Sequence, residues 1–173
     1  MSTMEKPNEM IYNAFIDCVQ ENQDRFYRLA YSYVKNKESA LDIVQNAIYN
    51  GLRAIHTLNE PSYVKTWFYR ILVNACIDEL RKTKRLVPTD PQELPEGAVS
   101  ESVSREELLD LQRALESLDP ESKTIVVLRY FEDMKLSDIA DVIGANLSTV
   151  KTRLYRALEK LKVELEGDVF KNE

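Results

Sequence analysis

A cluster of basic and hydroxyl-bearing side chains lies toward the C-terminal end of this 173-residue chain. Lys151, Arg153 and Arg156 fall within two helical turns, with Thr152 and Tyr155 between them. Cationic and hydrogen-bonding groups at this spacing can reach DNA phosphates and base edges from a single helix. Ordinary amphipathic helices also keep Lys and Arg in water, so the spacing alone leaves both interpretations open.

The stretch from residue 135 to 162 must position this cluster, and its pattern predicts two helices joined by a tight turn. Apolar residues repeat at helical spacing in each half. They are Leu136, Ile139, Ala140 and Ile143, then Val150, Leu154, Leu158, Leu161 and Leu165. Gly144 and Asn146 tolerate the left-handed backbone that ends helices, and we expect Ser148 to cap the second helix. The arrangement is typical of a helix-turn-helix, whose second helix enters the DNA major groove.

A second group of candidate residues lies in a helix predicted from about Ser62 to Lys84. Aromatic residues gather at its start: Tyr63, Trp67, Phe68 and Tyr69. Another face carries polar or charged residues every three or four positions: Arg70, Asn74, Asp78, Arg81 and Arg85. Rings beside cations suit unpaired bases, which stack on the rings while the cations hold the backbone. Alternatively the rings belong to the core, which we expect for Phe68 and leave open for Tyr63 and Tyr69.

Two helices are predicted ahead of this one, from about Met10 to Val34 and from about Glu38 to Ile55, with a turn at residues 35–37. Asn22-Gln23 is the place where the first helix could bend. The second keeps the helical period with Ala40, Leu41, Val44, Ala47, Ile48, Leu52 and Ile55. Its other face carries Asp42, Gln45, Asn46 and Asn50, which are either solvated or a docking surface.

Composition favours an all-α, soluble protein. Hydrophobic residues make up 44% of the chain and charged residues 30%, with only 4 glycines and almost no strand-like alternation. No apolar run reaches the length of a membrane span and the N-terminus lacks a signal-peptide pattern, so we expect the cytoplasm. Cys18 and Cys76 are expected to be buried free thiols rather than a regulatory disulfide, and His56 a surface residue. No metal site or cofactor is predicted.

The net charge of −6 conceals an uneven distribution. Residues 61–86 and 148–164 are rich in Lys and Arg, whereas the stretch between them is acidic. Residues 87–104 hold Pro88, Pro91 and Pro95 among like charges, which predicts a flexible acidic linker. We therefore expect two small helical domains, residues 1–86 and 105–173. In the second, a helix near residues 104–117 precedes another that Asp119 caps and Pro120 begins.

Taken in order, three segments between Phe26 and Lys162 resemble the extracytoplasmic function (ECF) sigma factors, the minimal class of bacterial promoter-recognition subunits. FYRLAYSYVKNKESALDIVQNAI resembles the region that grips core RNA polymerase, and SYVKTWFYRILVNACIDELRK the region that opens and reads the −10 element. ALESLDPESKTIVVLRYFEDMKLSDIADVIGANLSTVKTRLYRAL resembles the −35-binding domain. SYVKN, ALDIVQ, TWFYRIL and TVKTRLYRAL most resemble envelope-stress sigma factors of Firmicutes, including the lysozyme-responsive kind.

The resemblance implies sigma region 2 in the first domain, sigma region 4 in the second, and roles for three sets of residues. The −35 element is contacted by Ser148, Thr149, Lys151, Thr152, Arg153, Tyr155 and Arg156. The −10 element is melted and held by Tyr63, Trp67, Tyr69, Arg70, Asn74, Asp78, Arg81 and Lys82. Core polymerase is bound by Asp42, Gln45 and Asn46. Departures from the commoner pattern at Asn46, Leu147-Ser148 and Leu158 bear on promoter preference and one polymerase contact.

The resemblance also implies partners. They are the largest-subunit coiled coil and the flap of core polymerase, promoter DNA, and a membrane-anchored anti-sigma factor that holds the protein inactive at the inner face of the membrane. It implies no enzymatic activity of the chain's own and no small-molecule substrate. Alternatives from other classes are a self-sufficient helix-turn-helix repressor or activator and an all-α enzyme, which the absence of catalytic motifs disfavours. A sigma-like decoy that binds core without initiating also remains open.

Overall fold

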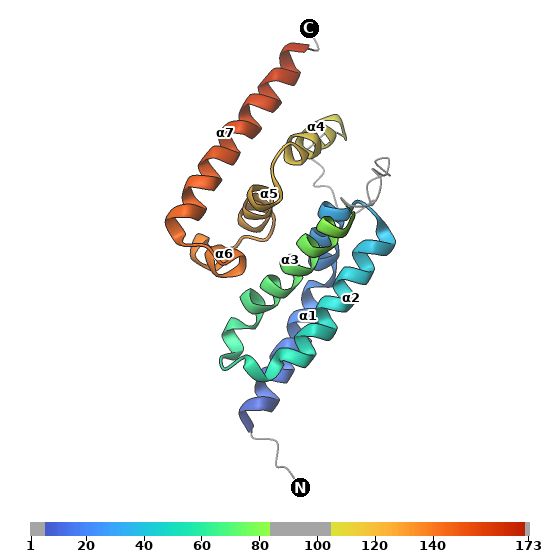
Figure 1. The fold of residues 1–173 in the computed structure, drawn as a ribbon, viewed down its shortest axis with the longest axis vertical. Coiled ribbons are helices and arrows are strands. Elements are labelled where there is room, and N and C mark those ends of the chain that lie inside the picture. The colour runs from blue at the N-terminus through green and yellow to red at the C-terminus, as the bar shows by residue number, and fades with distance from the viewer. Residues whose placement is uncertain (1–5, 84–104, 172–173) are drawn as a thin grey trace. The chain divides into compact units, whose positions relative to one another are not determined.

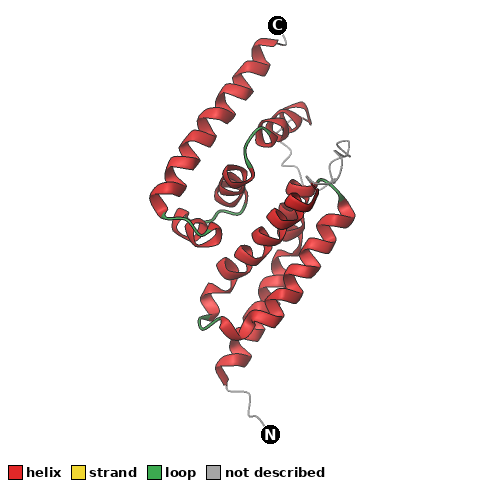
Figure 2. Ribbon diagram, viewed as in Figure 1, coloured by secondary structure: helices red, strands yellow, loops and turns green. Residues whose placement is uncertain are grey.

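The structure is a computed structural model that describes residues 6–83 and 105–171. Every element in these two ranges is helical, and the ranges contain no strand, which agrees with the predicted all-α class (Figure 2). The described residues form two compact units, one on each side of the undescribed stretch. The linker predicted at residues 87–104 lies outside the described residues.

The first unit packs three long helices against one another: α1 (Lys6–Val34), α2 (Lys37–Ala54) and α3 (Val64–Thr83) (Figure 1). Two short 3₁₀ turns, η1 (Ile55–Thr57) and η2 (Pro61–Tyr63), connect α2 to α3. The bend considered at Asn22 does not interrupt α1, because the Asn22 amide donates to the Cys18 carbonyl at 2.8 Å within a continuous helix. Asn36 caps α2 by accepting from the Ser39 amide at 2.9 Å.

Aromatic rings make up the centre of this unit. Phe15 and Phe26 of α1 lie 5.5 and 4.8 Å from the Phe68 ring of α3, measured between centroids. Tyr69 is also fully buried, and its ring meets Phe26 edge-on at 5.2 Å. At Gly51 of α2, a Cβ atom would come within 2.9 Å of Phe15 Cζ, so glycine allows α2 to approach this ring cluster closely. Phe68 and Tyr69 of α3 therefore pack in the centre of this unit.

The second unit contains α4 (Arg105–Glu116), α5 (Pro120–Val126), the π-helical turn η3 (Val127–Phe131), α6 (Leu136–Ile143) and α7 (Leu147–Lys171). Its core is aliphatic, with Ile125, Leu128, Ile139, Val142 and Val150 almost fully buried. Helix α7 packs on α4, α5 and α6. The long second helix of the predicted helix-turn-helix is thus supported by every other α-helix of its unit.

The caps of this unit follow local rules, with one correction. Asp119 accepts from the Ser122 amide at 3.1 Å and Pro120 begins α5, as predicted. Gly144 ends α6 with φ of 68°, the left-handed conformation expected there. The predicted cap of α7 is wrong: Asn146 accepts from the Thr149 amide at 2.8 Å, while the Ser148 hydroxyl donates to the Asn146 side chain.

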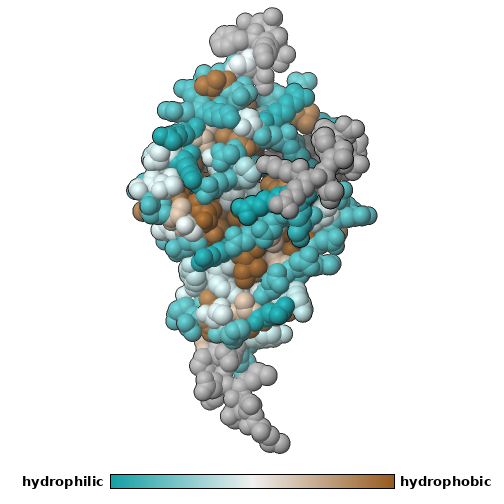
Figure 3. Space-filling model, viewed as in Figure 1, coloured by the Kyte–Doolittle hydropathy of each residue, from teal (hydrophilic) through white to brown (hydrophobic). Residues whose placement is uncertain are grey.

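Hydrophilic side chains cover most of the visible surface, with separate hydrophobic patches between them (Figure 3). None of the described helices is both long and apolar enough to cross a membrane. Within the described ranges, no group of three or more His, Cys, Asp and Glu side chains is placed to hold a metal ion.

Candidate functional site

Helix α7 separates its side chains into a packed face and an exposed face. Val150, Leu154, Ala157 and Leu161 are buried against the rest of the unit. Most of the residues predicted to contact DNA lie on the exposed side: Ser148, Lys151, Thr152, Tyr155 and Arg156 are exposed, and Thr149 is half-buried. Tyr155 is 63% exposed. The helix therefore presents cations, hydroxyls and one ring together.

The Thr152 hydroxyl is engaged within the helix. It donates to the Ser148 carbonyl at 3.0 Å, one turn earlier. The hydroxyl oxygen retains acceptor capacity, but its proton is directed along the helix axis. Of the predicted −35 set, the long cationic side chains of Lys151 and Arg156 thus have the greatest reach from the exposed face.

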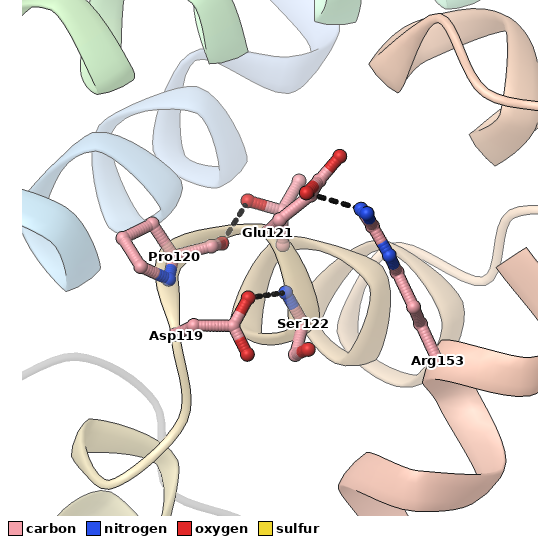
Figure 4. Close-up of polar contacts among 6 residues, drawn as sticks. Asp119, Pro120, Glu121, Ser122 and Arg153 are labelled. Carbon is pink, nitrogen blue, oxygen red and sulfur yellow. Dashed lines mark hydrogen bonds and ion pairs between the residues drawn. The ribbon is translucent and has the colours of Figure 1, made fainter. Parts of the chain in front are cut away.

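Arg153 lies apart from this exposed face. Its guanidinium extends from α7 to the Glu121 carboxylate in the first turn of α5, with which it forms an ion pair (Figure 4). Both side chains are partly covered, with 36% and 43% of their surface exposed. The structure thus places Arg153 toward α5 and apart from the exposed residues with which the sequence analysis grouped it, because a partner 32 positions earlier in the chain holds its charge.

Two further interactions link α7 to the end of α4 and to the start of α5. The Lys160 ammonium donates to the Ser117 carbonyl at 2.5 Å, at the C-terminal end of α4, where a cation is favourable. At Asp119, desolvation opposes ionisation, but hydrogen bonds from Ser122 and the charge of Arg153 outweigh it, so the pKa of this carboxyl lies below its ordinary value. Part of the basic charge of α7 therefore contacts other helices of its own unit.

Helix α3 presents a second polar face. Arg70, Asn74, Asp78, Arg81 and Lys82, all predicted to contact the −10 element, are exposed along it. Asp78 and Arg81 approach each other at 3.9 Å on the surface, which offsets part of the positive charge there. The face is therefore mixed in charge, unlike the more basic face at the start of α7.

The aromatic residues at the start of α3 do not share one environment. Tyr63 is 37% exposed and Trp67 is half-buried, with its ring edge-on to Phe15 at 6.0 Å. Tyr69 is fully buried at the centre of the helical bundle. This corrects its assignment to the base-contacting set: a ring enclosed by Phe26 and the rest of the core cannot stack on a base in this conformation.

Helix α2 carries Asp42, Gln45 and Asn46, all exposed as their predicted docking role requires. The sequence analysis placed Leu41 and Leu52 on the opposite, apolar face of this helix and did not single out Tyr49. Leu41, Tyr49 and Leu52 are also exposed, because the buried stripe of α2 consists of Ala40, Ile43, Ala47 and Gly51. The buried residues repeat every three or four positions, and this spacing is the signal that could have separated the buried stripe from the exposed apolar residues.

The second unit exposes one apolar feature that sequence analysis also missed. Tyr130 and Phe131, in the π-helical turn after α5, are each 55% exposed. Asp133 follows them in a left-handed conformation, with φ of 53°, which turns the chain toward α6. The turn thus directs two consecutive rings outward.

The two cysteines are buried free thiols, as predicted. Burial raises the pKa of Cys18, and raises that of Cys76 to about 12, so neither is a thiolate near neutral pH. His56 is exposed in η1, just after α2, and its Nδ1 lies 3.0 Å from the Arg53 carbonyl. None of these three residues belongs to the sets predicted to contact DNA or polymerase.

Comparison with known families identifies both units. Residues 18–86 match the family described as Sigma-70 region 2, and residues 108–161 match Sigma-70, region 4. The RNA polymerase sigma factor SigV of Bacillus subtilis is 44% identical over 150 residues, covering 87% of this chain and 90% of that protein. The ECF RNA polymerase sigma factor SigW of the same organism is 31% identical over 170 residues, covering 88% and 89%.

Solved structures share the fold. CnrH, in complex with the cytosolic domain of CnrY, aligns with a TM-score of 0.69 at 22% identity, covering 94% of this chain and 98% of that chain. The sigma factor RpoE from Bartonella quintana, in complex with the anti-sigma factor NepR, aligns with a TM-score of 0.68 at 22% identity, covering 87% and 97%. Given both region matches and the identity to SigV and SigW across most of its length, this chain belongs to the ECF family of RNA polymerase sigma factors.

Proposed function

We propose that this protein binds core RNA polymerase and directs it to promoters by reading two DNA elements with two separate helices. The observation that carries the proposal is the exposed face of α7, where Lys151, Thr152, Tyr155 and Arg156 stand together on a helix packed firmly from behind. Arginine and lysine at the start of such a helix can contact base edges and phosphates in the major groove. Helix α7 accordingly reads the −35 element.

Helix α3 acts on the −10 element. Tyr63 and Trp67 keep ring surface accessible at its start, and Arg70, Asn74 and Arg81 follow on the exposed face. Exposed rings stack on unpaired bases, and neighbouring cations hold the strand's phosphates. Asp78 and Lys82 belong to the same face, and we leave Tyr69 out of the contact set because it is buried.

Core polymerase docks on α2. Asp42, Gln45 and Asn46 provide polar contacts, and the exposed Leu41 and Tyr49 supply apolar area beside them. A mixed surface of this kind is typical of protein interfaces with an apolar centre and a polar rim. The matching element is the coiled coil of the largest polymerase subunit, and the flap meets the second domain.

Both DNA-reading units lie on one chain, residues 1–86 and 105–173, joined by the acidic linker at 87–104. Each unit alone makes few DNA contacts. When both are held on the polymerase, binding of one unit to DNA raises the effective concentration of the other unit near its own DNA element. The net charge of −6 keeps the free subunit from binding DNA non-specifically. The protein acts in the cytoplasm and catalyses no reaction of its own.

An anti-sigma factor controls the protein by covering these surfaces. Support comes from relatives of the same fold: RpoE was solved with the anti-sigma factor NepR, and CnrH with the cytosolic domain of CnrY. A regulator anchored in the membrane would hold this protein at the inner membrane face until an envelope-stress signal releases it.

Run-off transcription tests the proposal. Purified core polymerase, with and without this protein, is supplied with envelope-stress promoters and with a template library randomised at both promoter elements. Transcripts that require the protein and select defined −35 and −10 sequences are expected. Failure to bind core in a pull-down would contradict the proposal, and core binding without any transcript would identify a decoy.

A further inference from the structure

Arg153 differs from the other basic residues of the −35-reading helix in the direction of its side chain. Lys151 and Arg156 are exposed, whereas the Arg153 guanidinium is paired with Glu121 of α5 (Figure 4). Arg153, Ala157 and Lys160 follow at i, i+4 and i+7, so they lie along one side of α7. Ala157 is buried and Lys160 bonds to the end of α4, so this side belongs to the packing of the unit.

The partner of Arg153 is held in place by its own helix. Asp119 and Pro120 fix the start of α5, because the Asp119 carboxylate caps the Ser122 amide and the Thr124 hydroxyl donates to the Pro120 carbonyl at 2.7 Å. Glu121 lies between these anchored residues, in the first turn. A planar guanidinium paired with a carboxylate on such a turn restricts rotation of α7 about its axis more than an ammonium would.

We propose that Arg153 and Glu121 are positioning residues for −35 recognition: their ion pair fixes the rotation of α7 on α5, and Arg153 itself reads no base. The proposal rests on the proposed function and deepens it, since it names two residues that set promoter specificity by positioning Lys151 and Arg156. A partly exposed pair adds little to folding stability, so its effect falls mainly on how Lys151 and Arg156 meet the DNA.

The competing possibility is that Arg153 leaves Glu121 and contacts DNA directly. The two possibilities predict opposite results for Glu121→Ala. If Arg153 positions α7, Glu121→Ala and Arg153→Ala each lower the transcript ratio between a matched and a scrambled −35 element roughly fivefold, and the double variant falls no further. If Arg153 reads DNA, Arg153→Ala alone lowers the ratio, whereas Glu121→Ala releases a cation and leaves the ratio unchanged or higher.

A charge exchange gives a second, independent test. The variant Glu121→Arg/Arg153→Glu restores an ion pair between α5 and α7 with its polarity reversed. We expect it to recover at least half of the lost discrimination, because the pair and not the identity of residue 153 is what matters. A charge-exchanged protein that discriminates no better than Arg153→Ala would overturn the proposal. That result is expected if residue 153 contacts DNA directly, because a glutamate there would repel the phosphates.

Matched controls come from the same unit. Glu106→Ala removes an exposed acid from the start of α4, and Arg113→Ala removes a cation whose ion pair, with Asp110 at 3.8 Å, lies within its own helix. Both are expected to keep wild-type discrimination. All variants are compared by thermal unfolding, and transitions within a few degrees of wild type show that the effects are not due to unfolding.

The experiment separates the two proposals. All assays use the full chain with core polymerase, on the promoter selected from the randomised library. Wild-type protein that directs no promoter-specific transcript would contradict the proposed function. Wild-type activity with unchanged discrimination in Glu121→Ala would contradict the positioning role alone.

Discussion

Helices α3 and α7 carry the two faces that we propose read DNA, and they are held in place by different means. The buried side of α3 includes two large rings, Phe68 and Tyr69, which pack among the rings of α1. The buried side of α7 is aliphatic, and polar contacts reach it from the sides, Arg153 to α5 and Lys160 to α4. The same residue type therefore has two roles on each helix. The rings at α3 are divided between the core and the surface, and the cations of α7 are divided between contacts within the unit and the exposed face.

The largest effect expected from this comparison concerns the rings of α3. Tyr69→Ala removes a fully buried ring and should lower the free energy of unfolding of the first unit by about 3–5 kcal/mol. Tyr63→Ala should lower it by less, because this ring is partly exposed, and should instead reduce promoter opening. Urea unfolding followed by the fluorescence of Trp67, the single tryptophan of the chain, reports on this unit specifically.

Equal stability of the two tyrosine variants would contradict this division of the rings. Promoter opening is measured on the selected template with permanganate, which detects unpaired thymines. Tyr12→Ala, an exposed tyrosine near the start of α1, is the matched control and should leave both readouts unchanged.

The next effect concerns the cations of α7. Arg156→Ala should relax sequence preference at one −35 position by about 1–3 kcal/mol, if its guanidinium reads a base edge. Lys151→Ala should weaken binding to all sequences alike and reduce the slope of log K against log salt by about 1, as expected for a phosphate contact. Binding by the polymerase–sigma complex to matched and scrambled −35 duplexes at several salt concentrations measures both. Identical behaviour of the two variants would contradict the assignment of Arg156 to a base and Lys151 to a phosphate.

A smaller effect tests the corrected start of α7. Asn146→Ala removes the side chain that accepts from the Thr149 amide, and should destabilise the second unit by about 1 kcal/mol. Ser148→Ala removes only a hydroxyl that donates to Asn146 and should destabilise the unit much less than Asn146→Ala does. Circular dichroism detects the transition of this unit, which the fluorescence of Trp67 does not follow. A larger loss for Ser148→Ala would restore Ser148 as the cap.

The smallest effect is the pH dependence at the start of α5. Because the pKa of Asp119 is lowered in the folded state, its contribution to stability is complete above the ordinary value of 3.8 and is lost as the pH falls through the lower, folded-state pKa. Asp119→Asn keeps a capping oxygen without this titration, so the difference in stability between wild type and variant should shrink below about pH 4. A difference that is constant from pH 6 to pH 3 would show that the carboxylate charge contributes nothing.

Much of the fold could be predicted from local patterns. The helical period located α1, α2, α3 and the helix-turn-helix pair, and Gly144 and the Asp119-Pro120 step behave as their chemistry requires. The choice between Asn146 and Ser148 could not be made locally, because both side chains can cap the same helix and their relative placement decides which one does.

Contacts between distant parts of the chain account for the remaining differences. Tyr63 and Tyr69 are six positions apart in the sequence, and Tyr69 is core because it packs against α1, where its ring meets that of Phe26. Arg153 has the same spacing as its basic neighbours, but its partner Glu121 comes from another helix. Leu41 keeps the helical period yet lies outside, because α2 packs through Ala40, Ile43, Ala47 and Gly51, where Gly51 allows close approach to Phe15.

The central claim, that α7 reads the −35 element and α3 the −10 element, is tested most directly by site-specific crosslinking in the assembled initiation complex. A photoreactive phenylalanine derivative replaces Tyr155 on α7, Tyr63 at the start of α3, or Tyr12 on α1 as the control, and the crosslinked bases are mapped. We predict that position 155 crosslinks to the −35 duplex, position 63 to unpaired bases of the −10 element, and position 12 to neither. Crosslinks of position 155 outside the −35 element, or of position 63 to duplex DNA only, would contradict the account.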